Sequence, residues 1–414
     1  MRPGELLKKM KNGIGDLGLG VFGLVAMNAV LSLVVNPFIE HSFGAAFHGR
    51  ILFYTSLAAL MASAFGSGAN YGRLKIYSDE RETKNGEYNV FLLIVMAVLA
   101  GVTVLAIFLK KGDTAGSSFI GLFFLIVLTV LRYYGDVQYR MDLNYRRYAL
   151  YYVAIAVGYL AGMLLFRLTN SWVLIMITGE VFGLLFVGIS GTIFKKPVFA
   201  LTKDFGRHFR ILAVLSVSFL LSDFVASADR LLLPLFLDNG DELTAIFYYA
   251  SLVGKMMSLL STPLNGVLSG YLYNREGGIT SRQFLKVVLL MLGIFVLVTA
   301  VSVGGSHLFV CLFYRDHYPE ARPLFLLANA GQVIFFICNT MMVVVLRYTN
   351  EKIQMLISAA YIAVFLLVTI PLILHYGIYG MAWGILIVNL VKFILYAVLG
   401  LIGIRRKRKT EEAA

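Results

Sequence analysis

The sequence predicts an all-α polytopic membrane protein with twelve transmembrane helices, arranged as two six-helix lobes around a central cavity. Three observations lead to this fold class. Of the 414 residues, 59% are hydrophobic and only 14% are charged, whereas a soluble domain is about half apolar and about a quarter charged. Twelve apolar segments are long enough to cross a bilayer, which takes about 20 residues per helix. Basic residues cluster in alternate links between these segments.

The spans are expected in two sets of six. In the N-terminal lobe, 1–196, they are Ile14–Val35, Arg50–Asn70, Asn89–Leu109, Ser117–Gly135, Tyr148–Phe166 and Trp172–Phe194. In the C-terminal lobe, 211–404, they are Ile211–Leu233, Thr244–Ser269, Phe284–Gly304, Ala321–Leu346, Gln354–Leu374 and Tyr379–Ile404. A basic cytoplasmic linker, 197–210, joins the lobes, and a basic cytoplasmic tail covers 405–414. The first apolar run ends in Asn36-Pro37 without a small-residue cleavage site, which predicts a retained span rather than a signal peptide.

The distribution of lysine and arginine predicts the orientation. Because cytoplasmic loops of membrane proteins carry an excess of these residues, both termini are placed in the cytoplasm. The same topology explains the net charge of +13, so no nucleic-acid partner is expected. The two cysteines, Cys311 and Cys338, lack the spacing of a metal site, and no metal or cofactor is predicted.

Charged residues inside the spans mark the candidate site. Each costs about 2.5–3.5 kcal/mol at a helix centre on insertion scales, so it has to face a partner or water rather than lipid. Asp223 and Arg230 lie seven residues apart and share one face of the seventh span. In the eighth span, Tyr248 and Lys255 belong to a polar stripe that recurs at steps of three and four residues. Both stripes are therefore expected to face an interior.

Other polar residues in the spans extend this interior. They are Asn28 in span one, Glu180 in span six, Asp229 at the outer end of span seven, Asn329, Gln332 and Asn339 in span ten, and Lys392 in span twelve. Plainer alternatives stay open. Asp223 and Arg230 could lock helix packing, Glu180 could be a buried protonated acid, and the lysines could extend toward the bilayer surface. Asn and Gln in spans are often packing contacts, and Arg132 with Asp136 is interpreted as an interfacial pair.

An interior with lysines and an arginine suits an anionic substrate, because phosphate attracts fixed cations and arginine can hold it with two hydrogen bonds. The predicted substrate-binding residues are Arg230, Lys255, Lys392 and Tyr248. The candidates for carrying a coupling proton or sodium ion are Glu180, Asp223 and Asp229. The polar residues expected along the cavity are Asn28, Asn329, Gln332 and Asn339.

Three short segments carry a resemblance to a known family: ADRLLL at 228–233, FYYAS at 247–251 and HYGIYGMA at 375–382. With these, and over essentially its whole length, the chain is similar to the multidrug/oligosaccharidyl-lipid/polysaccharide (MOP) exporter superfamily. It resembles in particular the polysaccharide-transporter branch of Wzx-like, O-antigen-type flippases. The resemblance implies two lobes whose cavity opens alternately to each side of the bacterial cytoplasmic membrane. It also implies that undecaprenyl-diphosphate-linked oligosaccharides move to the outer leaflet under an ion gradient, and Asp229 and Arg230 match the family's Asp-Arg pair.

We therefore predict a flippase, not an enzyme, that acts as a monomer in surface polysaccharide biosynthesis. Its expected partners are lipid-linked oligosaccharide, H⁺ or Na⁺, membrane lipid and a polysaccharide polymerase or chain-length machinery. One alternative is a cation-coupled multidrug exporter of the same fold, which would favour an acidic and aromatic cavity over Lys255, Lys392 and Arg230. Another is a polytopic polysaccharide polymerase or glycosyltransferase, which needs a preorganised acid, base or metal. The sequence contains no Asp-X-Asp pair.

Overall fold

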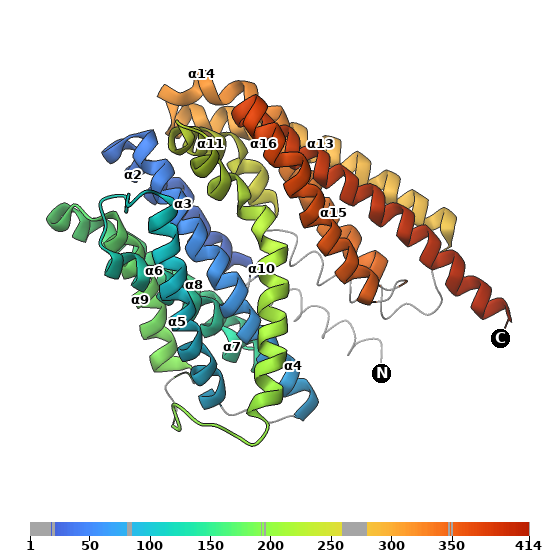
Figure 1. Cartoon of the computed structure of the whole chain (residues 1–414), viewed down its shortest axis with the longest axis horizontal. Coiled ribbons are helices and arrows are strands. Elements are labelled where there is room, and N and C mark those ends of the chain that lie inside the picture. Colours follow the sequence, from blue (N-terminus) through green and yellow to red (C-terminus); the bar gives the residue numbers. More distant parts are fainter. Residues whose placement is uncertain are drawn as a thin grey trace. The chain divides into compact units, whose positions relative to one another are not determined.

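The computed structural model describes residues 18, 21–80, 85–191, 193, 196–258, 280–346, 348 and 351–413. Over these residues the chain consists of helices with connecting turns and loops (Figure 1) and has no β-strand, which confirms the all-α prediction. It divides into two compact units, Met1–Leu231 and Leu232–Ala414. The first unit thus includes most of the seventh span, and the division into six-helix lobes at the linker stays a prediction.

The first unit is a bundle of long helices. After a helical segment at 21–30, its elements are η1 (Leu31–Val35), α2 (Asn36–Phe43), α3 (Ala45–Met61), η2 (Ala62–Ser67), α4 (Gly68–Glu80), α5 (Asn85–Leu109), α6 (Phe119–Gly135), α7 (Val137–Met141), α8 (Tyr145–Thr169), α9 (Trp172–Ser190) and most of α10 (Phe205–Phe236). α8 packs along α9, and α6 packs against α9, α3 and η2. One buried core of aliphatic and aromatic side chains runs through these helices.

Two π-helical turns, η1 and η2, interrupt the first two spans. The expected end of the first span at Asn36-Pro37 is wrong, because the helix continues through Pro37 to Phe43. Proline has no N–H and collides with the carbonyl one turn earlier, but it is tolerated in the first turn of a helix. The π-turn ends at Val35 and so places Pro37 in the first turn of α2.

The loop between α9 and α10 is fixed onto the start of α5. Asn89 Nδ2 donates to two backbone carbonyls of this loop, at 2.9 and 2.8 Å. Glu87 accepts from a backbone N–H of the loop at 3.0 Å, and its other oxygen lies 2.7 Å from His208 Nδ1. Buried contacts therefore hold the predicted linker 197–210, and its residues from Phe205 onward form the first turns of α10.

The second unit is built around α15. Its elements after the end of α10 are α11 (Gly240–Ser258), α13 (Ser281–Phe313), η3 (Arg315–His317), α14 (Tyr318–Ala321), η4 (Arg322–Leu324), α15 (Phe325–Leu346) and α16 (Glu351–Ala413). α15 packs against α11, α13 and α16. Gly377 breaks α16, with φ 57° and ψ −131°, a conformation that favours glycine. Tyr361 on the first arm bonds Asn389 on the second at 2.7 Å, so the two arms form a hairpin.

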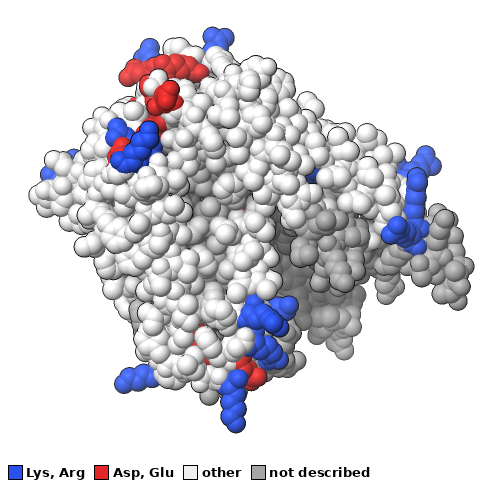
Figure 2. Space-filling model, in the orientation of Figure 1, with Lys and Arg blue, Asp and Glu red and all other residues white. Residues whose placement is uncertain are grey.

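Ten candidate membrane spans lie within the described residues. The break at Gly377 divides the longest of them into the two spans predicted there. α11 covers the start of the predicted span Thr244–Ser269, of which 259–269 lie outside the described residues. So do 14–17, 19 and 20 of the first span and 192 and 194 of the sixth. The described part of each predicted span thus falls on a helix, which confirms the prediction of an all-α polytopic membrane protein. Figure 2 shows the charged side chains gathered in separate patches, with a broad uncharged surface between them.

Candidate functional site

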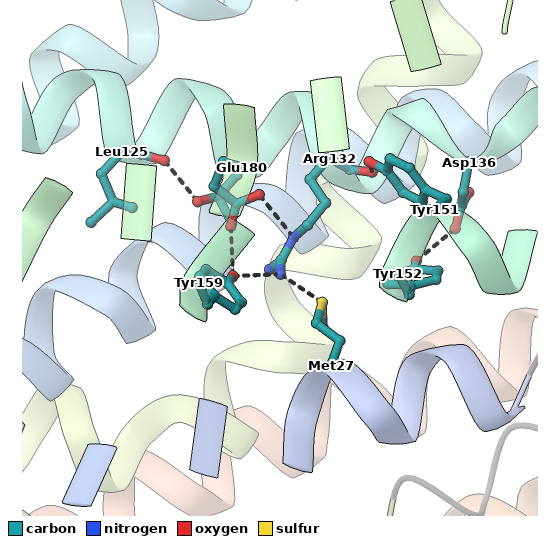
Figure 3. Close-up of polar contacts among 9 residues, drawn as sticks. Met27, Leu125, Arg132, Asp136, Tyr151, Tyr152, Tyr159 and Glu180 are labelled. Carbon is teal, nitrogen blue, oxygen red and sulfur yellow. Dashed lines mark hydrogen bonds and ion pairs between the residues drawn. The ribbon is translucent and has the colours of Figure 1, made fainter. Parts of the chain in front are cut away.

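A buried ion pair joins α6 to α9 in the first unit (Figure 3). Arg132 Nε lies 3.3 Å from Glu180 Oε2, and these side chains are 9% and 3% exposed. Tyr159 of α8 completes the group: Arg132 Nη1 donates to the tyrosine hydroxyl at 3.2 Å, and the hydroxyl donates to Glu180 Oε1 at 3.1 Å. The Met27 sulfur accepts from the same Nη1 at 3.3 Å. Four spans therefore meet at one arginine.

The prediction that Arg132 and Asp136 form an interfacial pair is wrong, because Arg132 is paired with Glu180. Side chains on a helix tilt toward its N-terminus, so the long Arg132 side chain extends away from Asp136, which lies one turn further along. Asp136 instead accepts hydrogen bonds from Asn70 and, at 2.8 Å, from the Tyr152 hydroxyl. The carboxylate of Asp136 ties α4 and α8 to the end of α6, whereas Arg132 reaches the interior.

Close contact between α8 and α9 places the tyrosine beside the glutamate. α8 carries a Gly-x-x-x-Gly motif, GYLAG at 158–162, and α9 carries a second, GEVFG at 179–183. A Cβ at Gly158 would lie 2.8 Å from the Cα of Gly179, so the two backbones approach where neither has a side chain. Such motifs bring membrane helices close together. The tyrosine and the glutamate each follow the first glycine of a motif, a signal in the sequence that would have paired them.

Three predicted site residues, Asp223, Asp229 and Arg230, lie on α10 in the first unit. Asp223 is half-buried and accepts a hydrogen bond from Ser63 in the π-turn η2. Asp229 is 1% exposed, and its Oδ1 lies 3.9 Å from Arg230 Nε. π-turns occur often at functional sites, and here the turn directs a serine hydroxyl at a carboxylate in the middle of a span.

In the second unit, Lys392 lies against two aromatic rings. Its Nζ is 4.1 Å from the ring centre of Tyr361 and 5.3 Å from that of Phe335, and the negative face of a ring attracts an ammonium group. The hydrogen bond of the Tyr361 hydroxyl to Asn389 fixes the orientation of the ring. A ring face is neutral overall, so these contacts stabilise the ammonium without cancelling its charge.

The other predicted residues of the second unit lie on α11 and α15. Tyr248 is buried and packs edge-on against Tyr249, with ring centres 6.1 Å apart. Lys255 is half-buried on the same helix. On α15, Gln332 is buried and Asn339 is half-buried. Their roles in binding stay predictions.

Two predicted cavity amides bond to helix backbones. Asn28 donates to a carbonyl of its own helix at 2.8 Å. Asn329 is fully buried and both donates to and accepts from the backbone of α11. These are the contacts of packing residues, the plainer alternative for amides in spans. The predicted site residues divide between the units, with Asn28, Glu180, Asp223, Asp229 and Arg230 in the first and Tyr248, Lys255, Asn329, Gln332, Asn339 and Lys392 in the second.

The sequence matches no protein family profile and no curated protein. The structure, in contrast, is similar to solved transporters. An inward-facing multidrug resistance MATE family transporter of the MOP superfamily aligns with a TM-score of 0.67 and 14% identity, over 95% of this chain and 96% of that one. The chain has the MATE transporter fold. A mutant of the Vibrio cholerae MATE transporter VcmN aligns with a TM-score of 0.61 and 14% identity, over 97% of this chain and 98% of that one.

A third MATE structure, that of the multidrug transporter DinF-BH, aligns with a TM-score of 0.62 and 15% identity, over 92% of this chain and 93% of that one. The MATE fold thus extends over nearly the whole of each chain compared. At this level of identity the likeness concerns the fold alone, so the substrate has to be argued from the side chains of this protein.

Proposed function

We propose that this protein is a membrane transporter that works by alternating access in the bacterial cytoplasmic membrane, with both termini in the cytoplasm. The observation that carries the proposal is the MATE fold over 95% of the chain. The excess of lysine and arginine in alternate links supports the orientation. In this fold, a cavity between two lobes would open first to one side of the membrane and then to the other.

The substrate is an undecaprenyl-diphosphate-linked oligosaccharide. In the first unit the buried acid Glu180 already has a cation, Arg132, at 3.3 Å, so it offers little attraction to a cationic drug. Lys255, Lys392 and Arg230 would attract the diphosphate, while the sugars cross a hydrated cavity and the prenyl chain stays in lipid. A polysaccharide polymerase would then use the translocated units.

Coupling to an ion gradient would act through Glu180, with Asp223 and Asp229 as further candidates. A proton on Glu180 removes its charge and therefore its attraction for Arg132, which loosens the contact between α6 and α9. A sodium ion would have to share the carboxylate with a guanidinium of the same sign only a few ångströms away. Coupling at this site therefore favours protons over sodium.

A cation-coupled multidrug exporter is the second candidate. The structural similarity favours it, since two of the similar proteins are multidrug transporters. The aromatic pair Tyr361 and Phe335 also favours it, because ring faces bind organic cations. In this protein the ammonium of Lys392 already lies on those rings, and it would repel a second cation.

A leaflet-resolved assay separates the two candidates. Purified protein in liposomes receives a fluorescent prenyl-diphosphate oligosaccharide, and an impermeant reagent reports its appearance in the opposite leaflet with and without a proton or sodium gradient. We expect movement stimulated by the proton gradient, lost in Lys392→Ala and retained in Lys286→Ala, which removes the same charge from an exposed position on α13. Efflux of organic cations from the same vesicles, with no movement of the lipid, would establish the second candidate instead.

A further inference from the structure

The carboxamide of Asn329 spans one turn of α11. Its Oδ1 accepts from the N–H of Gly254 at 2.8 Å, and its Nδ2 donates to the carbonyl of Ala250 at 2.9 Å. In an α-helix these two backbone groups pair with each other, since the N–H of residue i bonds the carbonyl of residue i−4. A side chain that inserts between the N–H and the carbonyl of such a backbone hydrogen bond is one of the few causes of a helix bend.

The surrounding residues are suited to this contact. Gly254 has no side chain, and a Cβ there would lie 2.8 Å from Asn329 Oδ1. Ser306 of α13 accepts from Asn329 Nδ2 at 2.9 Å and donates to the Ala250 carbonyl at 3.3 Å. α11, α13 and α15, which pack together in the second unit (Figure 1), therefore meet at one turn. The hydroxyl of Ser251 in this turn is buried and has no hydrogen-bond partner among the described residues.

Lys255 directly follows Gly254. We propose that Asn329 is a positioning residue that sets the direction in which α11 presents Lys255. A carboxamide is both donor and acceptor, so this turn can open and close while the Gly254 N–H and the Ala250 carbonyl keep partners. Unpaired backbone groups inside a membrane are costly, and a helix without such a side chain would resist bending there. The part of the inference that concerns substrate rests on the proposed function, in which Lys255 binds the diphosphate.

Hydrogen exchange tests the contact itself and needs no substrate. Asn329→Leu keeps the shape of the side chain and removes both hydrogen bonds to α11. In the full-length protein in nanodiscs, we expect the peptide that contains Gly254 to exchange about tenfold faster or more, because local opening exposes its amides. Thr340→Ala is the matched control, since Thr340 is buried on the same helix and its hydroxyl bonds its own helix, to Phe336. Unchanged exchange in Asn329→Leu would overturn the proposal.

A double-mutant cycle tests the link to Lys255 with a fluorescent prenyl diphosphate as the probe. If Asn329 acts through Lys255, Asn329→Leu and Lys255→Ala each weaken binding by about tenfold, and the double variant binds no more weakly than Lys255→Ala. Additive losses would show that Asn329 contributes only to general stability and would reject its role as a positioning residue. A wild-type protein that binds no prenyl diphosphate contradicts the proposed function, while the exchange experiment still decides whether Asn329 holds α11.

Discussion

The two units stabilise a cation inside a span in different ways. In the first unit, Arg132 is paired with the carboxylate of Glu180 and bonded to Tyr159. In the second, Lys392 lies over the rings of Tyr361 and Phe335. A carboxylate cancels the charge of the cation, whereas a ring face stabilises it and leaves the charge in place. A cation in the middle of a span can therefore be held either by a carboxylate or by ring faces.

This difference also sets how much stability depends on each cation. A buried ion pair contributes little net stability relative to apolar residues of the same size. Removing one partner is nevertheless strongly destabilising, because it leaves the other charge buried without a counter-charge. A ring face loses only a modest attraction when its cation is removed. Substitutions in the first unit are accordingly expected to have the larger effects.

The largest effect is expected from Arg132→Met, which leaves Glu180 buried without its counter-charge. We expect a loss of about 3–5 kcal/mol in the free energy of unfolding, measured as a lower unfolding temperature in detergent. Arg132→Met combined with Glu180→Met should recover most of this loss, because both charges are then absent. A double variant as unstable as Arg132→Met alone would mean that packing, and not charge, explains the role of the arginine.

An intermediate effect is expected from Gly158→Ala, which tests whether close contact between helices supports the arginine site. The added methyl group would lie 2.8 Å from the Cα of Gly179, so α8 and α9 have to separate, at a cost of about 1–3 kcal/mol. Gly101→Ala is the control, because nothing lies within 4 Å of its added Cβ. It should be neutral or stabilising by about 0.5–1 kcal/mol, since alanine is the better helix former. Equal unfolding temperatures for the two variants would contradict the close contact.

The smallest effect is expected from Tyr361→Phe at the aromatic site of the second unit. Tyr361→Phe keeps the ring face and loses the hydrogen bond to Asn389, which contributes about 0.5–1.5 kcal/mol. Tyr361→Leu also removes the ring under Lys392, a further loss of about 0.5–2 kcal/mol. Unfolding temperatures of the two variants separate these contributions. If Tyr361→Leu is no less stable than Tyr361→Phe, the ring does not stabilise Lys392 and the contrast between the units fails.

Several features of the site follow from local sequence, because they depend on spacing along one helix. The polar stripe with Asp223 and Arg230 lies on α10, and the Asp-Arg pair at 229–230 forms a contact within its own helix at 3.9 Å. The Gly-x-x-x-Gly motifs at 158–162 and 179–183 also indicate, from the sequence alone, where two helices can approach closely. The end of the first span was mispredicted because a π-turn can place a proline in the first turn of the helix that follows.

The sequence by itself determined the class of the protein, an all-α polytopic membrane protein, since hydropathy and segment length are properties of consecutive residues. The twelve predicted spans fall on helices wherever the structure describes them. Only the tertiary structure decided which polar groups meet. Arg132 finds Glu180 on another helix, and Asn329 bonds the backbone of α11, 75 residues earlier in the chain. Periodicity along a helix defines its polar face, but it does not say which helix lies opposite. That choice depends on how the whole bundle packs.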